Sequence, residues 1–298
     1  MDVWKFIKSV FQRTNKNWKL LVVEFIANVI MVIVVILGVA IPAIMIIVPA
    51  AAGDFEVNEF LPFVFEHLPY ILSSFLIFLI FLLGSFVLWG FVTGGVRGSL
   101  LTNILDGKGF ELKTFMAQCR KFFGRIIGLW ALTGFIYTLF FIVMGGLGSL
   151  LFLFCFRFYQ VGSEAGAILT GIFSGGIILL IFFVVGFLIN IFLAIATTYL
   201  IVEDAQVVDA MKGSVGFIKK YIGHTFLVVV ILFVISFGVS FAYSIAVMPL
   251  TMIPYVGSFF SLLLSPIQIG LNIYVVLFST IAYMILYLWK TKKITVDF

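Results

Sequence analysis

The stretch LLVVEFIANVIMVIVVILGVAIPAIMIIV, residues 20–48, decides the fold class, and Glu24 is its only charged residue. A helix needs about 20 apolar residues to cross the hydrocarbon core of a bilayer. This stretch is longer than that. Its apolar residues are continuous rather than alternating, which excludes the strand pattern of a membrane barrel. The stretch therefore predicts a transmembrane helix.

Five further stretches have the same character, at residues 70–96, 126–156, 167–202, 225–252 and 262–289. The whole chain is 63% hydrophobic and 10% charged, whereas soluble domains have about 45–50% apolar and about 25% charged residues. A soluble globular protein and a disordered chain are excluded, and two cysteines exclude a disulfide scaffold. We predict an all-α, polytopic six-helix transmembrane bundle that forms one integral membrane domain over residues 1–298.

The basic residues indicate the orientation of the spans. Of the 18 Lys and Arg residues, Arg157 alone falls on the outer side of the predicted arrangement. Because basic residues stay in the cytoplasm, we expect both termini to be cytoplasmic in a multi-pass protein of the cell membrane. The net charge of +5 is then a topology signal and an attraction to anionic lipid, and we expect no nucleic-acid partner.

Three cytoplasmic segments combine apolar residues at helical spacing with basic residues on the opposite face. Their apolar positions are Val3, Phe6, Ile7, Val10 and Phe11; Leu112, Phe115, Met116, Cys119, Phe122 and Phe123; and Val208, Met211, Val215, Ile218 and Ile222. This pattern predicts three amphipathic helices in the headgroup plane. Each precedes an odd-numbered span, which suggests a threefold repeat of residues 1–96, 97–202 and 203–298. The alternative is that amphipathic helices are simply common beside membranes.

Two features of the outer side need an explanation. Residues 167–202 would be about 54 Å long as one helix, whereas the hydrocarbon core is about 30 Å thick. We expect this span to tilt, protrude or break, with the glycine pair Gly175-Gly176 as the break. A short re-entrant piece is expected around residues 252–266, which contain two prolines.

Small side chains mark where transmembrane helices approach closely. The predicted helix-packing residues form two adjoining rows, namely Gly162, Gly166, Thr170 and Ser174, and Gly171 and Gly175. Their partner is another span of the same chain or a second copy in a homo-oligomer.

Ionisable groups inside the spans are nearly absent. Glu24 is the only acid within a predicted span, one turn from the inner boundary. We expect it to snorkel to the interface or to pair with Lys16 or Lys19, and the alternative is a functional intramembrane acid. The amides are expected to form hydrogen bonds between helices; they are Asn28, Asn190, Gln268 and Asn272.

No catalytic or metal-binding motif is recognisable. The chain has no G-x-x-x-x-G-K-[ST] loop, no G-x-S-x-G elbow and no H-E-x-x-H pair. His67 and His224 fall on opposite sides in the predicted topology. The acidic outer segment around residues 54–66 matches no defined metal loop. We therefore expect no enzymatic activity, no metal and no cofactor.

One cytoplasmic segment resembles a known family. Its sequence runs VED at 202–204, DAMKGS at 209–214 and FIKKY at 217–221. This is similar to the pattern of the glycerophosphoryl-diester phosphodiesterase membrane-domain family and related uncharacterised six-span prokaryotic membrane proteins. Residues 94–110 look like the loop of that family between spans 2 and 3. In those phosphodiesterases hydrolysis belongs to a separate soluble domain, so the resemblance implies a six-helix membrane module and carries over no catalytic residue.

The leading hypothesis is a non-enzymatic integral membrane protein that organises lipid or a membrane-protein partner. The expected partners are membrane lipids, anionic ones above all, and a second copy or another membrane protein. The candidates for holding lipid headgroups are Arg97, Arg120, Lys121, Arg125, Lys219 and Lys220. The alternative for these residues is that they only set the orientation. The alternative function is a permease subunit of an ABC-type transporter, with residues 112–123 docked on a separate ATPase, or a carrier of an apolar substrate.

Overall fold

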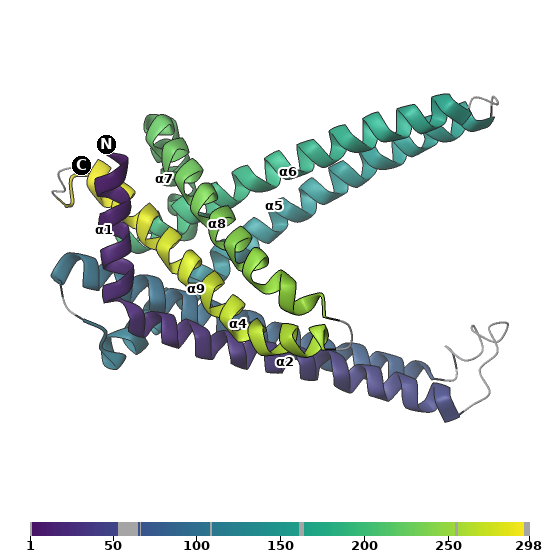
Figure 1. Ribbon diagram of the computed structural model, residues 1–298, viewed down its shortest axis with the longest axis horizontal. Helices are drawn as coiled ribbons and strands as arrows, with labels where there is room; N and C mark the ends of the chain where they lie inside the picture. The colour runs from purple at the N-terminus through teal and green to yellow at the C-terminus, as the bar shows by residue number, and fades with distance from the viewer. Residues whose placement is uncertain are drawn as a thin grey trace. The chain divides into compact units, whose positions relative to one another are not determined.

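The computed structural model describes residues 2–52, 65, 67–107, 109–160, 164–253 and 256–294. Over these residues the ordered elements are all helices, which confirms the all-α prediction (Figure 1). They are α1 (Val3–Lys16), α2 (Trp18–Ala52), α4 (Leu68–Asp106), α5 (Leu112–Gln160), α6 (Glu164–Val202), α7 (Val207–Lys220), α8 (Ile222–Thr251) and α9 (Gly257–Lys290). Within the described ranges, six of them are long and apolar enough to cross a membrane. The chain is therefore a multi-pass integral membrane protein.

The helices form two compact units. Unit 1 contains Met1–Gly124 and Ile235–Ile281, and unit 2 contains Arg125–Val234 and Ala282–Asp297. The long helices α5, α8 and α9 each contribute one part to each unit.

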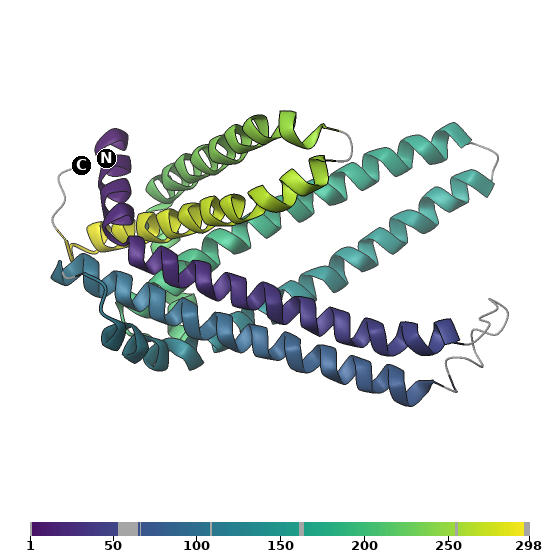
Figure 2. The same cartoon turned by 60° about the horizontal axis from the view of Figure 1, so that its bottom comes forward.

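In unit 1, α2 and α4 lie side by side along their length (Figures 1 and 2). A Cβ atom added to Gly38 of α2 would lie 2.6 Å from the Cβ atom of Phe81 on α4, so glycine permits the close approach. Farther along α4, Gly95 faces the ring of Phe115 and the thiol of Cys119 at the start of α5. Small residues thus bring three helices together, as expected where lipid supplies no hydrophobic driving force.

Helix α1 is a separate element that turns sharply away from α2 at Asn17 (Figure 1). Its side chains Phe6 (1% exposed) and Val10 are buried within the protein. The amide of Asn103 on α4 donates a 2.6 Å hydrogen bond to Oδ1 of Asn17, which fixes the turn. The expectation that α1 lays Phe6 and Val10 in the headgroup plane is not confirmed, because these residues are covered by protein.

The second expected interfacial helix, residues 112–123, is no separate element. It is the start of α5, which runs for 49 residues without interruption. Phe115 and Phe122 are buried, and Phe122 packs beside Gly94 of α4. Since no proline interrupts this stretch, the helix continues directly into the span.

Three further expectations on spans and loops are corrected. Arg97, placed in a loop by the sequence, lies within α4, which ends only before Gly107 (φ 69°). Helix α6 is continuous through Gly175-Gly176, since its helical hydrogen bonding needs no side chain there. Pro266, the expected end of a re-entrant piece, lies inside α9. Residues 254 and 255 of that segment fall outside the described residues.

Candidate functional site

Helix α7 has one face that is buried in the protein and a second, apolar face that is largely exposed. Its inward face consists of Ala210, Ser214 and Phe217, which are buried in unit 2. Gly213 lies against the ring of Tyr199 on α6, where a Cβ atom would not fit. The missing side chain at Gly213 therefore sets how closely α7 packs on α6.

The second face of α7 is the row that the sequence identified as apolar. Val208 is 55% and Val215 40% exposed, and Met211 and Ile218 are half-buried. By the helical repeat of 3.6 residues, this row lies beside the packed face, and Lys212 and Lys219 follow on its outer side. We call Val208, Met211, Lys212, Val215, Ile218 and Lys219 the α7 surface.

A pair of carboxylates anchors the segment that leads into α7. Arg125 of α5 donates hydrogen bonds to the backbone oxygen of Asp204 at 2.9 Å and to its carboxylate at 2.6 Å. Glu203 accepts hydrogen bonds from Tyr287 and from Lys293, both at 2.8 Å. Glu203 and Asp204 are the two acids of the VED sequence at 202–204. This part of the pattern that resembles the known family therefore holds unit 2 together.

The environment of Glu203 favours its charged form. Partial burial alone would raise the pKa of the carboxyl. The hydrogen bonds from Lys293 and Tyr287 and the charge of Lys293 outweigh that effect and hold the pKa below its ordinary value. Glu203 therefore stays ionised around neutral pH and keeps its ion pair with Lys293.

The six headgroup candidates divide between the units. Arg97, Arg120 and Lys121 belong to unit 1, and Arg125, Lys219 and Lys220 belong to unit 2. Four of them are exposed, namely Arg120, Lys121, Lys219 and Lys220. Arg125 is engaged by Asp204.

One basic residue of the α7 surface, Lys212, was missed among the headgroup candidates. It is exposed next to the apolar row of α7. The signal was available, because Lys212 precedes Lys219 by two helical turns and so lies on the same side of the helix.

Glu24 has a different neighbour from the one expected. Arg97 of α4 is the charged group that acts on the Glu24 carboxylate, and both side chains are half-buried. Lys16 instead donates a hydrogen bond of 3.0 Å to the backbone oxygen of Gly107. Glu24 and Arg97 thus lie within the spans α2 and α4, where attraction between their charged forms offsets part of the cost of burying them.

The predicted helix-packing rows of α6 are not where helices approach most closely. A Cβ atom added at Gly171 or Gly175 would meet nothing within 4 Å in the described protein. The hydroxyl of Ser174 donates to the backbone oxygen of Thr170 in its own helix at 2.6 Å. Gly166 is half-buried, and Gly162 lies outside the described residues. The role of these rows stays a prediction.

The side-chain amides within the spans differ in their hydrogen-bond partners. Asn28 donates to the backbone oxygen of Glu24 in its own helix at 2.8 Å. Asn190 of α6 donates to the hydroxyl of Tyr137 on α5 at 3.2 Å, a bond between helices. Gln268 and Asn272 line a pocket between α8 and α9.

Within the described part of the chain, no cluster of three His, Cys, Asp or Glu residues could hold a metal ion. The acidic residues of the outer segment, Asp54, Glu56, Glu59 and Glu66, lie outside that part. Comparison of the chain with known protein families, with curated proteins and with solved structures finds no match.

Proposed function

We propose that this chain is a non-enzymatic membrane module that binds anionic lipid at its cytoplasmic face, and that the α7 surface is its main lipid contact. The supporting observation is an exposed apolar row flanked by two lysines on a helix whose other apolar face is already packed. A helix of this kind places its apolar row at the boundary of the acyl chains and its lysines beside the phosphates.

The energies favour such an arrangement. Burying a valine side chain fully is worth about 1.5–3 kcal/mol, and Val208 and Val215 are both exposed. Each lysine near an anionic surface adds about 1 kcal/mol. The α7 surface would therefore gain several kcal/mol from an anionic bilayer, in addition to the contacts it already makes in unit 2.

The start of α5 has the same design in unit 1. Leu112 (65% exposed) and Met116 (39% exposed) form an uncovered row beside the buried Phe115. Arg120 lies on the outer side of this row and is exposed. We propose that this second surface binds lipid as well, and that the repeated design reflects the threefold repeat. Membership of the glycerophosphoryl-diester phosphodiesterase membrane-domain family is likewise a proposal.

The test is lipid retention by wild-type protein and by a Lys212→Gln/Lys219→Gln variant. Both are measured by native mass spectrometry in mixed micelles that contain phosphatidylglycerol or phosphatidylcholine. Removing two charges of about 1 kcal/mol each should lower the affinity for phosphatidylglycerol about 30-fold. Retention of phosphatidylcholine should change little, because its headgroup carries no net charge.

The matched control is Lys5→Gln/Lys8→Gln, which removes two exposed charges from α1. An equal loss of phosphatidylglycerol in both variants would show general attraction to anionic lipid and contradict a site on α7. A soluble subunit of nucleotide-binding size retained by the wild-type protein would favour the permease alternative instead.

A further inference from the structure

A row of polar side chains runs along α8 and another runs along α9, both within unit 1. On α8 the row consists of Ser236, Ser240, Tyr243, Ser244 and Thr251, and on α9 it consists of Ser261, Ser265, Gln268, Asn272 and Ser279. Spacings of three, four and seven residues keep each row on one face of its helix. No member of either row is charged.

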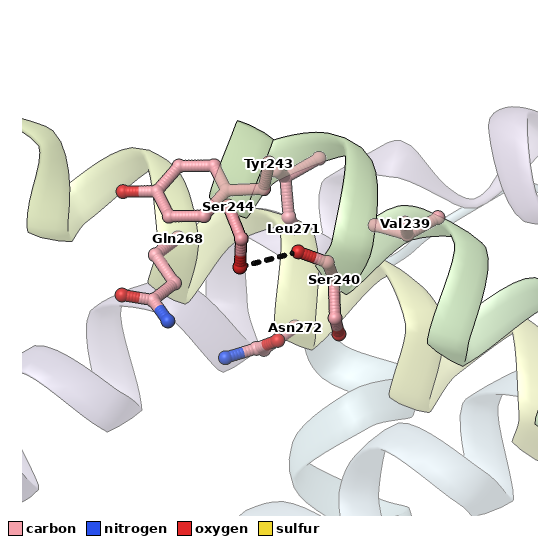
Figure 3. A pocket seen from close by; sticks show the side chains of 7 residues that line it. All are labelled: Val239, Ser240, Tyr243, Ser244, Gln268, Leu271 and Asn272. Carbon is pink, nitrogen blue, oxygen red and sulfur yellow. Dashed lines mark hydrogen bonds between the residues drawn. The ribbon is translucent and has the colours of Figure 1, made fainter. Parts of the chain in front are cut away.

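A pocket lies between the two rows (Figure 3). Gln268 and Asn272 reach into it from α9, one helical turn apart, beside Ser244 of α8. Its volume is about 50 Å³, and it is lined by Val239, Ser240, Tyr243, Ser244, Gln268, Leu271 and Asn272.

Near the proline in α9, side-chain hydroxyls donate hydrogen bonds to backbone oxygens beside the pocket. Pro266 has no N–H to give to the backbone oxygen of Leu262, and the hydroxyl of Ser265 donates to that oxygen instead at 2.8 Å. Tyr243 of α8 donates to the backbone oxygen of Leu264 at 3.0 Å. This bond ties the two helices together at one edge of the pocket.

The hydroxyl and amide side chains of the pocket differ in whether they form hydrogen bonds within the protein. Ser244 donates to the backbone oxygen of Ser240 in its own helix at 2.9 Å. Among the described residues, no hydrogen bond is made by the side-chain amides of Gln268 and Asn272. Inside a bilayer, hydrocarbon offers such groups no partner. A polar occupant of the pocket would satisfy both amides.

We propose that this pocket is a hydrated site, in which a few water molecules bridge Gln268 and Asn272 to Ser240 and Ser244. One water needs at least about 10–15 Å³ and two to four polar partners, and the pocket supplies both for more than one water. Because the lining is uncharged and offers donors and acceptors, the site accepts water or a neutral hydroxyl group of similar size and disfavours ions. The site is separate from the α7 surface.

The test is radiolytic footprinting of the wild-type protein in lipid nanodiscs, which oxidises side chains that lie next to bound water. Tyr243 lines the pocket, whereas Phe241 is an exposed aromatic residue of the same helix outside the lining. Tyr243 should be oxidised at least tenfold faster than Phe241. Equal rates would overturn the proposal.

A double variant of the pocket and a control variant outside it test whether the oxidation of Tyr243 depends on the pocket amides. Gln268→Leu/Asn272→Leu should bring the oxidation of Tyr243 down to the rate of Phe241. Asn190→Leu, which removes an amide from α6, should leave it unchanged. Unchanged oxidation of Tyr243 in the double variant would overturn the site. A dimer in native mass spectrometry of the wild-type protein, together with oxidation of Tyr243 as slow as that of Phe241, would overturn it as well.

Discussion

At the residue scale, Gly95 of α4 allows the start of α5 to pack where a side chain would not fit. A Cβ atom there would lie 2.6 Å from the ring of Phe115 and would also collide with the thiol of Cys119. Both of those side chains are buried, so neither can move aside without disturbing the packing of unit 1.

Gly95→Ala should therefore destabilise the protein by about 1–3 kcal/mol, the usual cost of overpacking. The measurement is thermal unfolding in detergent. Gly84→Ala in the same helix is the control, because a Cβ atom there meets nothing within 4 Å. If the two variants unfold at the same temperature, the contact between α4 and α5 is looser than described.

At the scale of elements, three helical segments combine a packed face with an exposed apolar row, and they differ in how they join the spans. Helix α1 ends at Lys16 and α7 is followed closely by α8, whereas residues 112–123 are continuous with the span in α5. In each segment the inward face contributes to folding, and the proposed lipid contact involves only the outward row.

Variants of two aromatic residues of α1 can distinguish packing against the protein from a position in the headgroup plane. Phe6 is 1% exposed and Trp4 is 74% exposed. Phe6→Ala should cost about 3–5 kcal/mol of stability, whereas Trp4→Ala should change it by no more than about 0.5 kcal/mol. Unfolding in detergent measures both variants. Equal small effects would mean that Phe6 lies in lipid, as the sequence pattern predicted.

At the scale of the whole molecule, the distribution of basic residues predicts the orientation in the membrane. A fluorescent protein that matures only in the cytoplasm should fluoresce when fused after Phe298 and stay dark when fused after Gln160. Alkaline phosphatase, which is active only outside the cytoplasm, should show the reverse pattern. The opposite result at both positions would place the α7 surface on the outer side and contradict its assignment to the cytoplasmic leaflet.

The sequence by itself determined the number of spans and their approximate positions. These follow from the apolar length of each stretch, which is a local property summed along one segment. It also singled out Glu24 and the amides Gln268 and Asn272, because polar groups are rare in such stretches. The ends of the helices were less predictable, and α4 continues ten residues beyond the expected Val96 to Asp106.

Only the tertiary structure decided which faces and which glycines make contacts. It packed Ala210, Ser214 and Phe217 of α7 inward and left the more apolar row outside. It placed Arg97 near Glu24 and opened a pocket between α8 and α9. Each of these outcomes depends on two surfaces that are distant in the sequence, and periodicity along one helix carries no information about the surface it will meet.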